Sequence, residues 1–206
     1  ADAAPGDVVM VSDVDEIPNP ARVAGPGNHP GGGIRVFDQL LFYFYGDYLC
    51  TTAPVWKGTR AVSAAALANA TLQDIRTRDK ETGLARAAVG DGGWHFSSLG
   101  GLARIIEKIE RTVHTEVDVP RFKNRAQIEA RIRAGEDIYF RGASYGRATG
   151  YELGYPVVKD WFEAHPGYLS PREVPPVGDA AAVARRHRGA FRFLRKIKRA
   201  WDRLAG

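Results

Sequence analysis

Residues 8–18 read VVMVSDVDEIP, a short apolar run that ends in three acids and a closing proline. The β-branched run Val8 to Val11 is typical of a buried strand. Open α/β sheets hold their ligands at the carboxyl ends of their strands. We therefore expect an α/β fold with Asp13, Asp15 and Glu16 at a functional edge of the sheet.

Asp13 and Asp15 stand two positions apart, so both carboxylates can bind one hard cation. Such a cation can also coordinate the oxygens of a diphosphate. The ordinary alternative is a turn whose acids only accept backbone hydrogen bonds. A helix-loop-helix calcium site is excluded, because Pro18 and Ala24 stand where its glycine and glutamate are required.

The 206 residues, 44% of them hydrophobic, can bury one substantial core. Composition predicts a domain over residues 1–165, a linker over 166–182 and a helix over 183–206. No apolar stretch approaches the roughly 20 residues of a membrane span. The lone Cys50 cannot form an internal disulfide, which favours a reducing compartment. We expect a cytoplasmic protein.

The basic charge is concentrated near the C-terminus, where seven arginines and two lysines lie between Arg185 and Arg203. One stripe of this expected helix is apolar and consists of Phe191, Leu194, Ile197, Trp201 and Leu204. Such a helix can lie peripherally on an anionic membrane surface or dock onto its own domain. Nucleic acid ranks last as a partner, because the slightly acidic domain shows no reader motif.

Residues 34–45 and 56–62 are predicted strands, and 64–78 and 126–134 are predicted helices. Gly135 is expected to end the second helix. The intervening residues 19–33 are rich in Gly and Pro and predict a loop near the site.

A second informative stretch, residues 91–101, reads DGGWHFSSLGG. Its glycines can let the backbone approach a ligand, and Ser97 or Ser98 can cap a following helix whose N-terminus favours anions. The alternative is a core Trp94 followed by an ordinary capped helix. Both interpretations remain open at this point.

Residues 113–118, VHTEVD, place His114, Glu116 and Asp118 on one face if the segment is extended. Such a face can complete a metal site or present a base to a hydroxyl. A solvated strand face is the commoner outcome.

Together these stretches resemble the family 17 glycosyltransferases, which include the animal enzyme that adds bisecting N-acetylglucosamine to N-glycans. The resemblance covers roughly residues 7–142. Its motifs occur in the family's order: Ser12–Pro18, Trp56–Thr59, Gly92–Ser97, Gly100–Gly101 with Lys108, and His114–Glu116.

The resemblance implies a GT-A-like, Rossmann-like mixed sheet flanked by helices. It also implies transfer of N-acetylglucosamine from UDP-N-acetylglucosamine to a glycan hydroxyl with inversion. In that interpretation Asp13 and Asp15 bind Mn²⁺ or Mg²⁺, which neutralises charge on the departing UDP.

The resemblance also assigns further roles to side chains. Inversion needs a base for the acceptor hydroxyl, and the candidates in order are Glu116, Asp91 and Asp118. Contacts to the donor are expected from Trp94, His95, Ser97 and His114, and either histidine can instead be a further metal ligand.

Only Ala1 to Asp7 precede the strand that leads into the Asp-x-Asp motif, whereas family members carry a sizeable segment there. The resemblance therefore implies that the part with the uridine pocket is lacking from this sequence.

The sequence also suggests two alternatives to a glycosyltransferase function. One is a haloacid-dehalogenase-like phosphatase with Asp91 in its later acidic loop, although Gly93, Trp94 and His95 stand where that family needs a second acid. The other is a non-catalytic sugar- or partner-binding protein held at membranes by residues 183–206.

Overall fold

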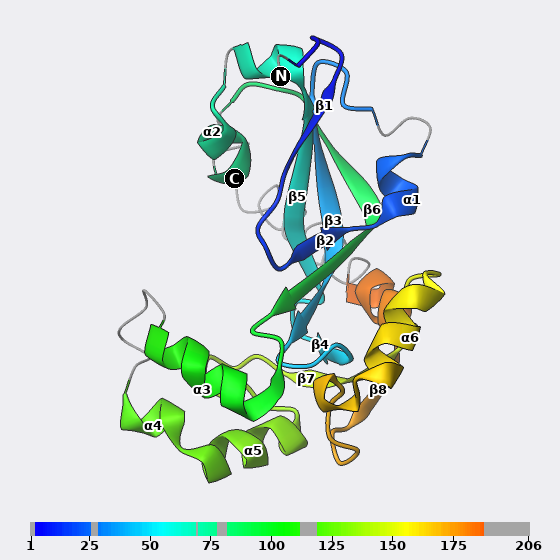
Figure 1. Cartoon of the computed structure of the whole chain (residues 1–206). Coiled ribbons are helices and arrows are strands. Elements are labelled where there is room, and N and C mark those ends of the chain that lie inside the picture. Colours follow the sequence, from blue (N-terminus) through cyan, green and yellow to red (C-terminus); the bar gives the residue numbers. More distant parts are fainter. Residues whose placement is uncertain (1–2, 26–28, 69, 78–81, 112–118, 188–206) are drawn as a thin grey trace, which may run out of the picture. The chain divides into compact units, whose positions relative to one another are not determined.

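The chain is described from a computed structural model over residues 3–25, 29–68, 70–77, 82–111 and 119–187. In this part of the chain, helices accompany eight strands of a mixed sheet, so the predicted α/β class is confirmed (Figure 1). The chain divides into two compact units: unit 1, residues 1–41 and 55–97, and unit 2, residues 42–54 and 98–206.

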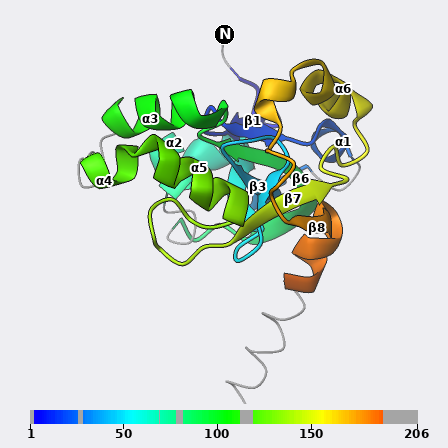
Figure 2. The same cartoon turned by 90° about the horizontal axis from the view of Figure 1, so that it is seen from below.

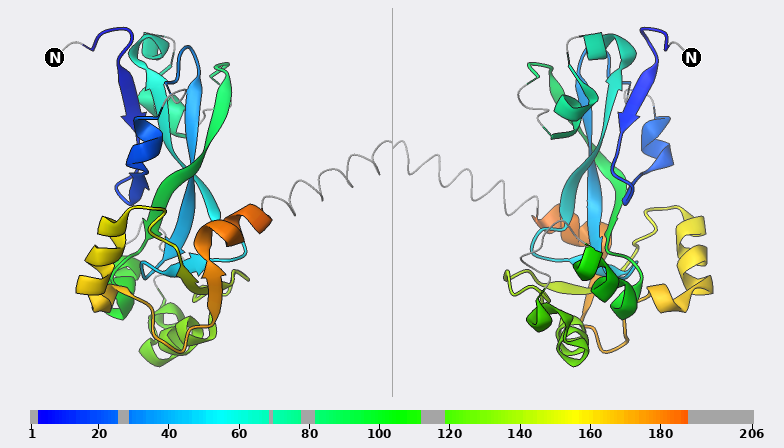
Figure 3. Two further views of the ribbon diagram at one scale, coloured as in Figure 1. Left: turned by 90° about the vertical axis from the view of Figure 1, so that its right-hand side faces the viewer. Right: turned by 60° about the vertical axis from the view of Figure 1, so that its left-hand side comes forward.

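Unit 1 is built on antiparallel strand pairs. Strand β1 (Val8–Val11) pairs with β5 (Val55–Ser63), and β5 pairs with β3 (Ile34–Tyr43). Strand β6 (Arg86–Ser97) lies beside β3 and pairs with the short β2 (Glu16–Pro18). Figure 3 shows β3, β5 and β6 running side by side.

Strand β1 has the predicted bounds but not the predicted burial. Val8 is 44% exposed, and β1 stands first in the order of the described strands. Val9 and Val11 pack against one core cluster, while Met10 packs against another. The expectation of a buried strand was wrong, because β-branched composition indicates a strand without fixing its place in the sheet.

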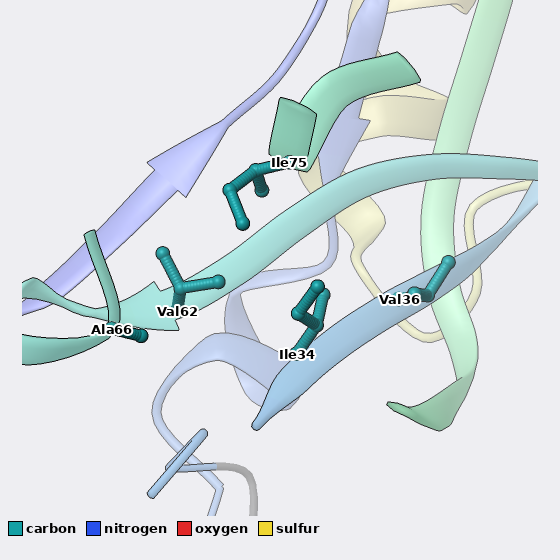
Figure 4. Close-up of a cluster of buried hydrophobic side chains, with 5 residues drawn as sticks. All are labelled: Ile34, Val36, Val62, Ala66 and Ile75. Carbon is teal, nitrogen blue, oxygen red and sulfur yellow. The ribbon is translucent and has the colours of Figure 1, made fainter. Parts of the chain in front are cut away.

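The main core cluster of unit 1 joins the sheet to its helices (Figure 4). It consists of Ile34, Val36, Val62, Ala66 and Ile75. The predicted helix over 64–78 is divided into a 3₁₀ helix, η1 (Ala64–Ala68), and α2 (Leu72–Thr77). Thr71 Oγ1 accepts a hydrogen bond from Asp74 N at 3.1 Å, and Asp74 Oδ2 accepts one from Thr71 N at 3.2 Å. These reciprocal bonds start α2 and place Ile75 in the core.

A short helix stands within the predicted Gly- and Pro-rich loop. Helix α1 (Pro20–Val23) is capped by Asn19, whose side chain accepts a hydrogen bond from Ala21 N at 3.0 Å. Helix α1 contacts β6 (Figure 1). This contact ties the segment that follows β2 to the same sheet.

Unit 2 contains the smaller part of the sheet. Strand β4 (Tyr48–Cys50) pairs antiparallel with β7 (Tyr145–Thr149), which pairs parallel with β8 (Pro176–Asp179). Strand β3 runs over into this unit, where Phe42 pairs with Leu49. Tyr48 stacks on Tyr145 with ring centroids 5.0 Å apart, and both rings are buried.

The helices of unit 2 cover its strands in two groups. Helix α3 (Gly101–Arg111) contacts α4 (Pro120–Lys123) and α5 (Arg125–Ala134) (Figure 2). Helix α5 ends at Gly135, as predicted, with a left-handed φ of 72°. Helix α6 (Pro156–Ala164) leads into the 3₁₀ helix η3 (Pro166–Tyr168).

The segment 166–182, predicted as a linker, is folded into unit 2. It contains η3 and β8, and the side chain of Val174 is fully buried. Asp47 accepts hydrogen bonds from the N–H and hydroxyl of Ser170 at 2.7 and 3.0 Å. Proline and glycine here shape a packed connection, so their abundance alone misled the prediction.

Residues 180–187 are helical, and the rest of the predicted basic helix 183–206 lies outside the described residues. Within the described ranges, none of the helices combines the length and the apolar character needed to cross a bilayer.

Candidate functional site

The acidic motif forms the turn between β1 and β2. The N–H of Glu16 donates to the carbonyl oxygen of Asp13 at 3.0 Å, and Phe96 N donates to the carbonyl oxygen of Asp15 at 2.9 Å. Val14 is fully exposed at the tip of this turn. The side chains of Asp13 and Asp15 keep 36% and 28% exposure, so solutes can reach both carboxylates.

Asp13 is paired with an arginine from α2. Arg76 Nε donates to Asp13 Oδ1 at 2.6 Å, and the Arg76 side chain is 46% exposed. The hydrogen bond from Arg76 holds the pKa of Asp13 below its usual value. The carboxylate is therefore charged, and a positive group already neutralises it.

Glu16 is the buried member of the acidic motif, with 7% exposure. Its Oε1 accepts a hydrogen bond from Trp56 Nε1 at 2.7 Å, and its Oε2 accepts one from Asp13 N at 3.2 Å. Burial opposes the charged form, but the adjacent His95 ring and the Trp56 and Asp13 N–H groups outweigh it. The pKa of Glu16 therefore lies below its usual value.

His95 stands between two carboxylates. Its Nε2 lies 3.6 Å from Asp15 Oδ2, and its Nδ1 lies 3.8 Å from Glu16 Oε1. The ring is 5.0 Å from the ring of Trp56. Nδ1 is buried and has no hydrogen-bond partner among the described residues. A buried polar atom of this kind calls for a water, an ion or a ligand.

A chain of polar side chains supports the turn from beneath. Ser12 Oγ and Thr59 Oγ1 are 2.7 Å apart, and Gln39 Nε2 donates to Thr59 Oγ1 at 3.1 Å. Gln39 Oε1 is buried without a partner in the described part of the chain. A Cβ at Gly58 would lie 1.6 Å from that oxygen, so glycine alone leaves it room.

Gly92 and Gly93 allow the backbone of β6 to pack closely against the backbones of β3 and β2. A Cβ on Gly93 would lie 2.1 Å from Ile17 O, and one on Gly92 would lie 2.8 Å from Asp38 N. Gly93 has a φ of 123°, which side-chain-bearing residues rarely adopt. The expectation that these glycines admit a ligand is not met here, because neighbouring strands occupy the space.

Gly93→Ala is expected to destabilise the protein by about 2 kcal/mol, since the methyl group strains φ and pushes β2 from β6. Urea denaturation would measure the change. Gly32→Ala is the matched control, because nothing lies within 4 Å of its added Cβ. Equal stability of the two variants would contradict the close approach of β2 and β6.

One of the expected donor contacts, Trp94, is a buried core residue. Trp94 is 1% exposed and packs in the interior, so its ring is a core element in this structure. Ser97 is the half-buried last residue of β6. Within this motif, the His95 side chain and the Phe96 N–H contact the acidic turn.

Asp91, a candidate base, does not join it. Its Oδ2 forms an ion pair with Arg22 Nη2 at 3.2 Å, and both side chains are largely exposed. Asp91 stands four positions before His95 in β6, and its ion pair with Arg22 places its carboxylate beside α1. The other two candidate bases, Glu116 and Asp118, lie outside the described residues, as does His114.

The donor chemistry suits a hard cation, but the present arrangement is incomplete. Two carboxylates are ligands that Mn²⁺ and Mg²⁺ prefer, whereas the imidazole of His95 is more typical of softer transition metals. Within the described ranges, no three His, Cys, Asp or Glu side chains are arranged to hold a metal ion. Arg76 is bonded to Asp13 Oδ1, so a cation at this turn would compete with the guanidinium group for that carboxylate.

Sequence reasoning missed Arg76, which carries no motif and reaches Asp13 only through the packing of α2. Trp56 and Thr59 were found as part of a motif, but their contacts to Glu16 and Ser12 were not foreseen. Comparisons of the chain with models of protein families, with curated proteins and with solved structures give no match.

Proposed function

We propose that this protein is a metal-dependent inverting glycosyltransferase of the family 17 type, with a GT-A-related fold. It would move N-acetylglucosamine or a related sugar from a UDP-sugar to a glycan hydroxyl. One observation carries the proposal: three stretches of the resemblance, far apart in sequence, meet around Glu16. Ser12 contacts Thr59, Glu16 binds Trp56, and His95 lies between Asp15 and Glu16.

In this proposal Asp13 and Asp15 hold Mn²⁺ or Mg²⁺ at the exposed turn. The bound cation would offset negative charge on the departing UDP. Glu16 keeps the turn in place through the Trp56 and Asp13 N–H groups, and His95 orients Asp15. Glu116 remains the first candidate to accept the proton of the acceptor hydroxyl, followed by Asp118.

A second candidate function is non-catalytic binding of a sugar or partner. The observation that favours it is the ion pair between Asp13 and Arg76, which already satisfies one of the two proposed metal ligands. A protein of this kind would not need a divalent cation.

The test is stabilisation by UDP with Mn²⁺. Ligand at a hundred times its Kd adds about 2.7 kcal/mol. For a chain of this size, that corresponds to a rise in Tm of about 5–10 °C. The rise should be absent in an Asp13→Ala, Asp15→Ala double variant and in the presence of EDTA.

Arg76→Ala sharpens the test, because it removes the cation that competes for Asp13. Mn²⁺ should bind this variant more tightly than the wild type. Arg22→Ala is the matched control, since Arg22 is equally exposed and pairs with Asp91 in the same unit. If UDP raises the Tm at no Mn²⁺ concentration, the proposed transferase function is wrong. Hydrolysis of an aryl phosphate by the protein would favour the phosphatase instead.

A further inference from the structure

Strand β1 forms an open edge of the sheet in unit 1. Among the described strands it pairs with β5 alone, and Figure 3 shows it at the outer edge of the unit 1 strands. Its four residues keep part of their surface exposed, up to 44% at Val8. The backbone groups of an edge strand can pair with another extended chain.

The pairing with β5 determines which backbone groups of β1 are open. Ala64 N donates to Asp7 O at 2.8 Å, so the carbonyl group of Asp7 faces β5. Backbone groups alternate in direction along an antiparallel strand. Val8 and Met10 therefore direct their N–H and C=O groups away from β5, to the open edge. These groups are two donors and two acceptors at a spacing of two residues.

A cavity of about 310 Å³ lies beside this edge. Its walls come from β1, from the neighbouring strands β5 and β3, and from the end of α1 with the segment that follows. The apolar wall residues are Val8, Met10, Val23, Ala24, Phe37 and Ala61. The side chains of the two residues with open backbone groups thus form part of the cavity wall.

His29 is the polar side chain in this wall, and both of its ring nitrogens have partners. Gly31 N donates to Nδ1 at 3.1 Å, which leaves Nε2 to donate to the carbonyl oxygen of Gly6 at 3.1 Å. The imidazole therefore has no nitrogen available for a ligand. The cavity suits an apolar group.

We infer that β1 and this cavity bind an extended peptide segment with large apolar side chains at alternate positions. The peptide would add a strand to the sheet and pair with the open N–H and C=O groups of Val8 and Met10. Residues that stand opposite each other in a sheet have their side chains on the same face. The side chains opposite Val8 and Met10 would therefore lie on the face that holds the cavity.

A second copy of the chain fits this site less well than a separate peptide. Its β1 would offer the side chains of Val8 and Met10, but both already line the cavity of their own copy. Met10 also packs against the core cluster that contains Phe37 and Ala61. A second copy would pair with the backbone and leave the cavity empty, whereas a peptide can do both.

The experiment uses the full chain and a blocked peptide of sequence Lys-Thr-Leu-Thr-Leu-Thr-Lys, without UDP or metal, because the inference is independent of the proposed transfer. Amide hydrogen exchange is followed by NMR. In the free chain, the amides of Val8 and Met10 should exchange faster than those of Val9 and Val11, which face β5. The peptide at ten times its Kd should slow exchange at Val8 and Met10 about tenfold.

Met10→Pro removes one open donor and leaves the bonds to β5, because proline is tolerated where the N–H of an edge strand is unpaired. It should weaken peptide binding about fivefold or more, the effect of one lost hydrogen bond. Met10→Leu is the matched control, since it keeps the donor and an apolar side chain, and it should bind like the wild type. Ala24→Phe should weaken binding by filling the cavity from its opposite wall.

Equal binding by Met10→Pro and Met10→Leu would show that the edge is not the site. If Met10→Pro does not fold, as judged by circular dichroism, a peptide N-methylated at both leucines replaces it, and equal binding of that peptide overturns the inference. Equal binding of a peptide with serine at both leucine positions would do the same for the cavity. A dimer of the chain that Met10→Pro dissociates in ultracentrifugation would make the second copy the occupant and the inference wrong.

Discussion

Replacing Trp94 by alanine is expected to lower the free energy of unfolding by about 3–5 kcal/mol, the cost typical of removing a large buried ring. Trp94 is 1% exposed and belongs to β6, where it stands opposite Ile17 of β2. Its loss would leave a cavity in unit 1 beneath the candidate site. Urea denaturation followed by circular dichroism would measure the change.

Trp56→Ala is the informative comparison, since Trp56 is 42% exposed and donates to Glu16. We expect it to cost far less stability but to reduce the stabilisation by UDP and Mn²⁺. The opposite outcome is that Trp94 is dispensable for stability and Trp56 is essential. It would contradict the assignment of Trp94 to the core and of Trp56 to the site. Trp94 would then be the ligand contact that the sequence suggested.

Replacing Glu16 by alanine is expected to cost about 1–3 kcal/mol, since it leaves hydrogen-bond donors without an acceptor. The Trp56 and Asp13 N–H groups would lose their acceptor, and His95 would lose one of its two carboxylates. Glu16→Gln should cost less, because its amide oxygen can still accept from Trp56. Glu136→Gln is the control, since Glu136 is exposed and pairs with Arg131 at the surface.

The lowered pKa of Glu16 sets the direction of a pH effect. A carboxyl group whose pKa is lower in the folded state stabilises the protein above its unfolded value, here 4.5, and loses that contribution as the pH falls through the folded value. Stability should therefore fall below pH 4.5, and it should fall less steeply in Glu16→Gln. Parallel curves for both proteins would show that Glu16 does not titrate as described.

The positions of β1, β3 and β5 could be predicted from the sequence, because apolar, aromatic and β-branched residues recur in 8–11, 34–45 and 56–62, whereas the full length of β6 (Arg86–Ser97) was not predicted. Their pairing could not. The register that sets Ile17 against Trp94 joins residues 77 positions apart, and no local pattern encodes it. We expected the acidic residues at the carboxyl-end edge of an open α/β sheet. The strands of unit 1 that carry them pair antiparallel instead.

The same limit applies to the candidate site. The family resemblance pointed to His95, whereas local composition identified Asp13 and Asp15, because acids after a strand are a recognisable pattern. It could not distinguish glycine that admits a ligand from glycine that admits a neighbouring strand, as at Gly93. The role of Arg76 could not be predicted from the sequence. An exposed arginine on a short helix carries no recognisable pattern, and only the packing of α2 places it beside Asp13.

Unit 1 is assembled from two separate stretches of chain, and residues 42–54 leave it for unit 2 before β5 returns. Strand β3 contributes residues to both units. No single gene breakpoint can therefore separate the acidic turn from the aromatic helix α6 and leave both units whole. The two would be inherited, duplicated or lost together, as one indivisible module.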